Sequence, residues 1–354
     1  MQLSDFNYML PKERIARYPT EKRDQSRLLR LVRSTGQISH HRFSDLPDLL
    51  TGQDLIVLNN TKVIPARLIG RCLRVLCDQS RITETLGARI EILLVKPLEK
   101  DIWVILVKAG RKVRVGDRLQ FGKGQLEALV LERGEKGLRI VCFKYQGDFD
   151  SIVDQLGHVP LPPYIHRRDE RQDRTRYQTI YASKRGAIAA PTAGVHFTPG
   201  VFDHFREKGV ACCEVTLHVG LGTFRPVVND RIEDHRMEAE PFEITTEAAQ
   251  MISKARSTGQ RIVAVGTTVT RVLESAWRGT EQDLQLRGET DLFIYPGFSF
   301  GCIGALLTNF HLPGSTLLML VCAFAGRDLV FQAYHQAIRE NYRFYSYGDC
   351  MLIE

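Results

Sequence analysis

The chain has no cysteine pair spaced for a zinc site and no apolar stretch long enough to cross a membrane. Its eight cysteines are scattered and none forms a Cys-x-x-Cys pair, whereas a structural zinc site needs clustered Cys and His at ligand spacing. The longest apolar run, 317–325, falls well short of the roughly 20 residues that a membrane helix requires. We therefore expect reduced thiols, no metal and a cytoplasmic protein.

The sequence also lacks a signal peptide, repeats and two common catalytic motifs, which excludes further classes of protein. The first ten residues include Asp5 and no apolar core, unlike a signal peptide. We find no low-complexity segment, no internal repeat, no phosphate-binding P-loop and no Ser-His-Asp constellation. With 44% hydrophobic and 25% charged residues over 354 positions, the composition is that of an ordinary globular protein of one or two domains. We expect it to be a monomer.

Positive charge is concentrated in two stretches. The net charge is +7. Between Lys108 and Lys144 there are ten Lys or Arg and four Asp or Glu, and between Arg167 and Arg185 seven basic and three acidic residues. Such clusters are typical of surfaces that bind a nucleic-acid backbone, and equally of a solvated basic face with no partner.

The patterning of the chain predicts an α/β protein with an inserted small antiparallel β-barrel. Short alternating runs separated by glycine and charged turns fill the region 63–156 and favour the barrel. Strand-like and helical runs alternate after about residue 175 and favour an α/β body. We expect residues 1–62, a helical start followed by a strand at 55–58, to join that body, which gives a discontinuous larger domain of 1–62 and 157–354. The strands expected are 90–95, 103–108, 126–131, 138–143, 187–190, 213–217, 262–265 and 292–295, and the helices are 199–208, 246–258, 269–278, 315–325 and 329–341.

Most residues of chemical interest follow strands, where ligands bind in open α/β sheets. After the strand 55–58, Asn60 and Lys62 are candidates to hold a ribose or phosphate, with Arg67 close behind; a polar turn closed by asparagine side chains is the simpler alternative. In the small-residue segment 189–199, Thr192 and His196 are candidates, His196 as an acid or base. A hydrogen-bonded structural histidine is the alternative there.

Three further segments carry the other candidates. Thr216 and His218 precede a Gly-x-Gly that lacks the third glycine and helix of a dinucleotide fingerprint. Thr267 and Thr268 open a helix after a strand, a place that suits an anion or a polar ligand. The last pair, Asn309 and His311, lies between two apolar runs, before a helix capped by Ser315.

Five segments of the chain form an ordered set. They are 59–67 (NNTKVIPAR), 190–197 (APTAGVHF), 215–224 (VTLHVGLGTF), 265–268 (VGTT) and 308–313 (TNFHLP). In this order they resemble the S-adenosylmethionine:tRNA ribosyltransferase-isomerase family of queuosine biosynthesis, and the resemblance runs from about Leu3 to Leu352.

The resemblance implies a reaction and its partners. Family members transfer and isomerise the ribosyl group of S-adenosylmethionine onto 7-aminomethyl-7-deazaguanine at the wobble position of tRNA. The product is epoxyqueuosine, and adenine and methionine are released. S-adenosylmethionine is then a substrate, tRNA is the partner, and no metal is implied. The family fold is an α/β domain with an inserted barrel.

The chemistry requires a base, an acid and exclusion of water. A sulfonium acidifies the 5′ hydrogens, so a base can start ring opening while adenine leaves. The tRNA amine then adds at the 4′ carbon, and ring closure with loss of methionine forms the epoxide. We expect His196, His218 and His311 to supply acid and base in an order left open, with Glu240 as a fourth candidate. The residues expected to position substrate are Asn60, Lys62, Arg67, Thr192, Thr216, Thr267, Thr268 and Asn309.

The chain departs from the family pattern at several positions. Gly304 stands where an aspartate is expected, and Gly301 stands where a lysine is expected. The stretch 235–240 reads HRMEAE and lacks a second histidine, and residues 73–88 form a longer segment than is usual. The missing aspartate means either altered activity or a position that is only structural.

Two other classes remain open at this point. An S-adenosylmethionine-dependent RNA methyltransferase would use the same small molecule and a similar basic surface. An RNA-binding protein that has lost catalysis would keep the basic surface, and Gly301 and Gly304 are the features that favour it.

Overall fold

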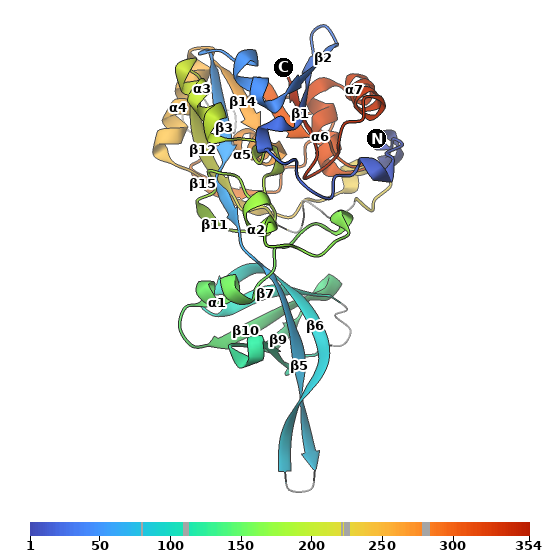
Figure 1. Ribbon diagram of the computed structural model, residues 1–354, viewed down its shortest axis with the longest axis vertical. Coiled ribbons are helices and arrows are strands. Elements are labelled where there is room, and N and C mark those ends of the chain that lie inside the picture. Colours follow the sequence, from blue (N-terminus) through green and yellow to red (C-terminus); the bar gives the residue numbers. More distant parts are fainter. Residues whose placement is uncertain (79–80, 109–112, 221, 223–226, 278–283) are drawn as a thin grey trace. The chain divides into compact units, whose positions relative to one another are not determined.

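The computed structural model describes residues 1–78, 81–108, 113–220, 222, 227–277 and 284–354. The chain divides into two compact units (Figure 1). The first comprises Met1–Lys62, Pro162–Arg168 and Thr175–Glu354, and the second comprises Val63–Leu161 and Asp169–Arg174. Asp169 is held within the second unit because it accepts a hydrogen bond from Val159 N at 3.0 Å and pairs with Arg67.

The first unit is built on a nine-stranded sheet in the order β15-β13-β12-β3-β14-β16-β17-β1-β2. Four central strands are parallel, namely β12 (Ala211–Leu217), β3 (Asp54–Asn59), β14 (Arg261–Val265) and β16 (Ala305–Asn309). Numbered by their order along the chain, they stand across the sheet as 2-1-3-4, so the direction of winding reverses between β3 and β14. This reversal is the point where ligands bind in doubly wound sheets.

Helices cover both faces of this sheet. In β3 every residue is buried, which is the pattern of a parallel strand covered on both sides. Leu55 and Val57 belong to the core shared with α4 (Thr246–Ser257), α5 (Thr267–Ala276), α6 (Thr316–Ala325) and α7 (Arg327–Arg339), whereas Ile56 and Leu58 belong to the core shared with α3 (Pro199–Glu207). The predicted helices all form, each within two residues of its expected start and end.

The edges of the sheet differ from expectation. The predicted helical start is three short 3-10 turns, Leu3–Phe6, Lys12–Arg14 and Arg23–Gln25, followed by an antiparallel pair that the sequence did not reveal, β1 (Arg27–Val32) and β2 (Gln37–Arg42). β1 pairs with β17 (Cys350–Ile353), a partner more than 300 residues away that local patterning does not indicate.

Two predicted strands are wrong in position. β11 spans Lys184–Ala187, and residues 188–190 are irregular; the last of them, Ala190, lines the pocket described below. Residues 292–295 are also irregular, since the strand β15 (Arg287–Thr290) ends earlier and Leu292 O accepts a hydrogen bond from Arg271. The far side of β12 is completed by β13 (Glu240–Ile244).

The second unit is a closed six-stranded antiparallel barrel in the order β10-β7-β6-β5-β8-β9. Alternate residues face its interior, for example Leu126, Ala128 and Val130 on β9, as expected of a small barrel filled by side chains. The predicted fold class, an α/β body with an inserted antiparallel barrel, is confirmed. The strands are β5 (Arg67–Asp78), β6 (Arg81–Glu99), β7 (Ile102–Lys108), β8 (Arg118–Phe121), β9 (Leu126–Arg133) and β10 (Leu138–Tyr145), and α1 (Phe149–Leu156) follows.

The long segment noted at 73–88 forms the outer part of one hairpin. β5 and β6 pair from Arg67–Leu93 out to Asp78–Arg81, whereas β5 pairs with β8 only over residues 70–73. The hairpin therefore continues past the barrel as a two-stranded ribbon (Figure 1).

Over the described residues, no single helix has the length and apolar character to span a membrane. Only α6 and α7 taken together pass that test, and they meet at a bend of 114°. Across the same residues, no group of three or more His, Cys, Asp or Glu is arranged to hold a metal ion.

Candidate active site

A pocket opens at the carboxyl ends of β14 and β16, beside the reversal of the sheet. It contains about 480 Å³ of free space, part of it open to solvent. The lining residues are Ala190, Pro191, Thr192, Ala193, Val219, Gly266, Thr267, Thr268, Thr308, Asn309, His311, Leu317, Tyr345 and Ser346. Five predicted site residues therefore meet here, although they come from three distant segments: Thr192, Thr267, Thr268, Asn309 and His311.

One wall is the first turn of α5. Gly266 leaves β14 with a φ of +94°, a backbone conformation that favours glycine. The chain can therefore turn directly into the helix, and Thr267 and Thr268 reach the pocket with their amides at the positive end of the helix dipole. Asn59, at the end of β3, donates from Nδ2 to Thr268 Oγ1 at 3.5 Å and to Leu217 O at 3.0 Å, which ties three elements together below the pocket.

His311 is the predicted acid–base candidate that lines the pocket. Its Nε2 lies 2.8 Å from Thr308 Oγ1, its backbone N–H donates to Tyr334 Oη at 3.0 Å, and its carbonyl accepts from Tyr8 Oη at 2.5 Å. Burial lowers its pKa from 6.5 to about 3. The imidazole is therefore held neutral, with Nδ1 as the ring nitrogen available to a ligand.

His196 lies behind the pocket wall. It is buried, its Nδ1 lies 2.7 Å from Ser26 Oγ, and its Nε2 lies 3.2 Å from Asn309 Nδ2. Burial, and then the charges of Arg23 and Arg343, lower its pKa to about 3. It touches a lining residue rather than the pocket itself.

Tyr345 forms another wall in a strained conformation. Its φ is +75°, unusual for a bulky residue, and its ring packs edge-on against Tyr164 with centroids 3.8 Å apart. Strain of this kind clusters at functional sites. Its neighbour Phe344 is fully buried in the aromatic core around Phe310 and Tyr334.

A second group of predicted residues is bonded within itself. Asn60 donates from Nδ2 to Glu214 Oε2 at 3.0 Å and accepts at Oδ1 from Thr216 Oγ1 at 2.7 Å. His218 Nδ1 lies 2.7 Å from Thr61 Oγ1, and burial lowers its pKa. These contacts fix the ends of β3 and β12, and these side chains are not among the lining residues.

Glu240 forms a buried ion pair with Arg271. Arg271 Nη1 donates to Glu240 Oε2 at 2.5 Å, while Glu240 Oε1 accepts from Gly220 N at 2.7 Å. Arg271 also donates to Thr290 O and Leu292 O, each at 3.0 Å. Because both charges are buried and mutually bonded, this arrangement supports the loop at Gly220.

The remaining two predicted residues are not among those that line the pocket. Lys62 is exposed on the short strand β4 (Thr61–Val63). Arg67 belongs to the second unit, where it forms an ion pair with Asp169.

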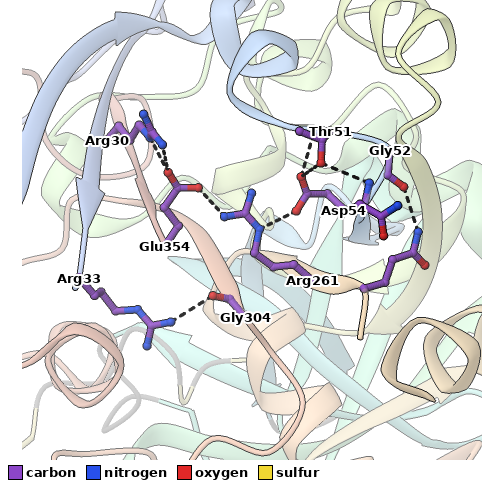
Figure 2. Close-up of polar contacts among 10 residues, drawn as sticks. Arg30, Arg33, Thr51, Gly52, Asp54, Arg261, Gly304 and Glu354 are labelled. Atoms are coloured by element: carbon purple, nitrogen blue, oxygen red, sulfur yellow. Dashed lines mark hydrogen bonds and ion pairs between the residues drawn. The ribbon is translucent and has the colours of Figure 1, made fainter. Parts of the chain in front are cut away.

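Gly304, where an aspartate is expected, lies at the end of the sheet opposite to the pocket. Gly304 directly precedes β16, whereas Asn309 ends it, so about five residues, or roughly 16 Å of strand, separate them. Figure 2 shows what surrounds Gly304: Arg33 donates to its carbonyl at 3.1 Å, and Arg261 bridges Asp54 at 2.6 Å and Glu354 at 2.5 Å. A Cβ on Gly304 would lie 2.8 Å from Arg261 Cγ.

Gly304→Asp should leave catalysis unchanged, because the position is remote from the pocket. We expect kcat/KM to change by no more than about twofold, as for substitutions without contact to a site. Steady-state kinetics would test this, with Gly301→Lys measured beside it. Gly301 N donates to Glu274 at 2.9 Å in a second remote cluster. A gain of tenfold or more in either variant would show that these positions limit activity.

The two buried histidines should make stability fall with acid. The unfolded chain binds their protons near pH 6.5 and the folded chain only near pH 3. Stability is therefore full above pH 6.5 and is lost as the pH falls, by about 1.4 kcal/mol per pH unit for each imidazole. Urea unfolding would measure how much the free energy of unfolding falls between pH 7 and pH 5. In His196→Asn this fall should be smaller than in the unsubstituted protein by about 2 kcal/mol. In the control His204→Asn, at an exposed position, it should equal that of the unsubstituted protein. Parallel losses in all three proteins would contradict the lowered pKa.

Several residues at the site were not predicted. Ser346 and Val219 line the pocket, and Ser26 contacts His196 from the start of β1. Arg23 donates to Val195 O and Gln178 O, each at 2.8 Å, and so fixes the segment that carries His196. Nothing in the local sequence links Ser26 or Arg23 to residues 150 or more positions away.

A pocket at the carboxyl edge of a doubly wound sheet, lined by threonines, an asparagine and a neutral histidine, defines the larger unit as an α/β enzyme domain. The queuosine biosynthesis protein family model matches residues 3–353. The chain belongs to this family.

Named relatives span the whole chain. A protein of Carboxydothermus hydrogenoformans is 52% identical over 354 residues and one of Desulfitobacterium hafniense is 48% identical over 353, each with full coverage of both chains. Both are named S-adenosylmethionine:tRNA ribosyltransferase-isomerase. The crystal structure of an S-adenosylmethionine tRNA ribosyltransferase from Thermotoga maritima is 40% identical, with a TM-score of 0.55, and the match covers 99% of this chain and all of that one.

Proposed function

We propose that this chain is an S-adenosylmethionine:tRNA ribosyltransferase-isomerase whose reaction takes place in the pocket at the carboxyl ends of β14 and β16. The observation that carries the proposal is that family segments from three parts of the chain converge on this one pocket. Its substrates are then S-adenosylmethionine and a tRNA bearing 7-aminomethyl-7-deazaguanine. The products are epoxyqueuosine in tRNA, adenine and methionine.

His311 is the group we assign to proton abstraction. A base must be neutral before it accepts a proton, and burial keeps His311 neutral at physiological pH. The same burial makes the imidazole a weaker base, so the assignment rests on its position in the pocket rather than on its pKa. In the tautomer whose Nε2–H donates to Thr308 Oγ1, Nδ1 carries the free lone pair, and this is the tautomer we assign. A 5′ hydrogen of the sulfonium substrate placed against this nitrogen can be removed to begin ring opening.

The threonines of the pocket are proposed to position the substrate, and its apolar residues to exclude water. Thr192, Thr267 and Thr268 present hydroxyls to the same space, and the start of α5 presents backbone amides. These groups suit the ribose hydroxyls and the substrate carboxylate. Ala190, Ala193 and Leu317 give the pocket apolar surface that excludes water from a reactive intermediate.

Basic residues of the barrel are the proposed contacts for tRNA. Arg111 and Lys112, which belong to the basic stretch between Lys108 and Lys144, lie outside the described residues, whereas Arg114, Lys123 and Lys136 of the same stretch are exposed. In the second basic stretch the side chains of Arg167, Arg174 and Arg176 donate to backbone carbonyls, which is a structural use of those charges.

Replacing Arg114, Lys123 and Lys136 by alanine should weaken tRNA binding and flatten its salt dependence. Each lost phosphate contact lowers the slope of log K against log salt by about 0.7–0.9. Filter binding over a salt series would measure the slope, with exposed Lys254→Ala as the control. An unchanged slope would remove the barrel from the tRNA interface.

The test of the function uses S-adenosylmethionine labelled separately in the ribose and in the methyl group. The enzyme is incubated with tRNA that carries the aminomethyl deazaguanine, and free adenine is followed. Ribose label in tRNA with stoichiometric adenine release is the expected result. Methyl label in tRNA would identify a methyltransferase instead, and tRNA binding without any transfer would identify an inactive relative.

A further inference from the structure

One buried oxygen at the pocket has no partner within the described part of the chain. It is Oδ1 of Asn309, a residue that is 1% exposed and lines the pocket. A buried carbonyl oxygen without a hydrogen bond is costly, so such atoms in folded proteins mark a place that a ligand or water fills. The alternative is an Asn309 side chain rotated by 180°, with Oδ1 and Nδ2 exchanged.

A chain of hydrogen bonds fixes the direction, beginning at a group that can only accept. Ser26 Oγ donates to the backbone carbonyl of Arg23 at 3.2 Å. With its one proton on that carbonyl, the Ser26 oxygen accepts from His196 Nδ1 at 2.7 Å, which agrees with the amide direction that the carbonyls of Tyr345 and Asp349 require of Asn309. The neutral imidazole of His196 therefore carries its proton on Nδ1 and presents a lone pair at Nε2.

The same logic orients the amide. His196 Nε2 can only accept, so the atom of Asn309 that faces it at 3.2 Å is the donor Nδ2. The second N–H of this group points to the carbonyls of Tyr345 and Asp349, both at 3.3 Å. Three acceptors surround Nδ2, and turning the amide would place Oδ1 against all of them.

We propose that Ser26 and His196 are positioning residues that hold Asn309 Oδ1 as a hydrogen-bond acceptor for an N–H or O–H group of the nucleoside of S-adenosylmethionine. The inference rests on the proposed function, since it names the contact by which that pocket recognises its substrate. Two donor sources share this chemistry: the exocyclic amine of adenine and the ribose hydroxyls. His196 then acts through Asn309 and takes no proton from the substrate.

The first test reads the tautomer of His196 by ¹⁵N NMR of the full-length protein. In the unsubstituted protein the ring should be neutral from pH 5 to pH 8 with its proton on Nδ1. In Ser26→Ala that preference should weaken, because nothing then accepts from Nδ1 and only the carbonyls that face Asn309 Nδ2 still favour the same tautomer. A proton on Nε2 in the unsubstituted protein would overturn the proposal, since Nδ2 of Asn309 would then face a donor.

The second test measures equilibrium binding of S-adenosylmethionine and of three analogues, lacking the 6-amino, the 2′-hydroxyl or the 3′-hydroxyl group. For one analogue the unsubstituted protein should lose about tenfold in affinity, as expected for one hydrogen bond to a buried acceptor. That analogue identifies the donor. In Ser26→Ala the discrimination should shrink, because His196 Nε2 is then no longer held as an acceptor and only the two carbonyls orient the amide of Asn309. Ser257→Ala, on the exposed end of α4, should keep the full discrimination.

The outcomes separate the two claims. If S-adenosylmethionine binds and Ser26→Ala keeps the full discrimination, the positioning role is wrong while the proposed function stands. If no analogue is discriminated, Asn309 Oδ1 makes no contact with the nucleoside and the inference also fails. If S-adenosylmethionine does not bind the unsubstituted protein, the proposed function fails and the inference fails with it.

Discussion

His311→Ala should lower the rate of adenine release by about 10²- to 10⁴-fold, the usual contribution of a general base. The reason is geometric: His311 lines the pocket, its ring is fixed by Thr308, and the residue is anchored by Tyr8 and Tyr334. Its lowered pKa keeps it in the basic form, so kcat should show no histidine inflection between pH 5 and pH 8. Single-turnover kinetics with saturating tRNA would measure the loss directly.

The matched controls separate chemistry from folding. Exposed His204→Ala should retain full activity. Added imidazole should restore part of the rate in His311→Ala, since it can enter the vacated space and accept the proton. A variant that is folded, unresponsive to imidazole and within tenfold of the original rate would exclude His311 as the base.

Arg271→Met should destabilise the larger unit by about 3–5 kcal/mol, because it leaves the buried carboxylate of Glu240 without its counter-charge. Arg271 and Glu240 are each about 4% exposed in their side chains. Urea unfolding should show the loss, and the double variant Arg271→Met, Glu240→Met should recover most of it. A loss below about 1 kcal/mol in the single variant would mean that the pair contributes little, as surface pairs do.

A second variant, Glu240→Gln, tests whether Glu240 transfers protons in the reaction. We expect Glu240→Gln to keep most of the activity, since its carboxylate is bonded to Arg271 and Gly220 rather than directed at the pocket. A fall in kcat as large as that of His311→Ala would assign Glu240 a direct chemical role. In that case the buried pair would be part of the reaction centre.

The sequence predicted the pocket residues correctly where each of them directly follows a strand of the parallel sheet. Thr267 and Thr268 follow β14, and Asn309 and His311 follow β16, so an open parallel sheet brings all four to one edge. The helix that begins after Ser315 was also readable, because the Ser315 side chain accepts from Leu318 N at 3.2 Å.

The sequence was uninformative where function depends on a long-range partner. His196 looked like a free acid–base candidate, and only its contacts with Ser26 and Asn309 place it behind the wall. Asn60 looked like a substrate ligand, and only the pairing of β3 with β12 brings Thr216 to it. Such pairings depend on strand order, which periodicity and composition do not encode.

At Gly304 the family pattern raised the possibility of altered activity, whereas the fold puts this residue far from the pocket. The position lies among Arg33, Arg261 and Glu354 at the amino edge of the sheet (Figure 2). The negative charge that an aspartate would bring is already supplied there by Asp54 and Glu354, both of which bond to Arg261. Loss of the aspartate therefore fits a structural position.

A crystal structure of the chain bound to S-adenosylmethionine would test the position of the active site most directly. We expect the nucleoside in the pocket at the carboxyl ends of β14 and β16, with the 5′ carbon against His311 Nδ1 and a donor group against Asn309 Oδ1. S-adenosylmethionine bound elsewhere, for example beside Glu240 or at the amino edge near Arg261, would contradict the assignment of the site.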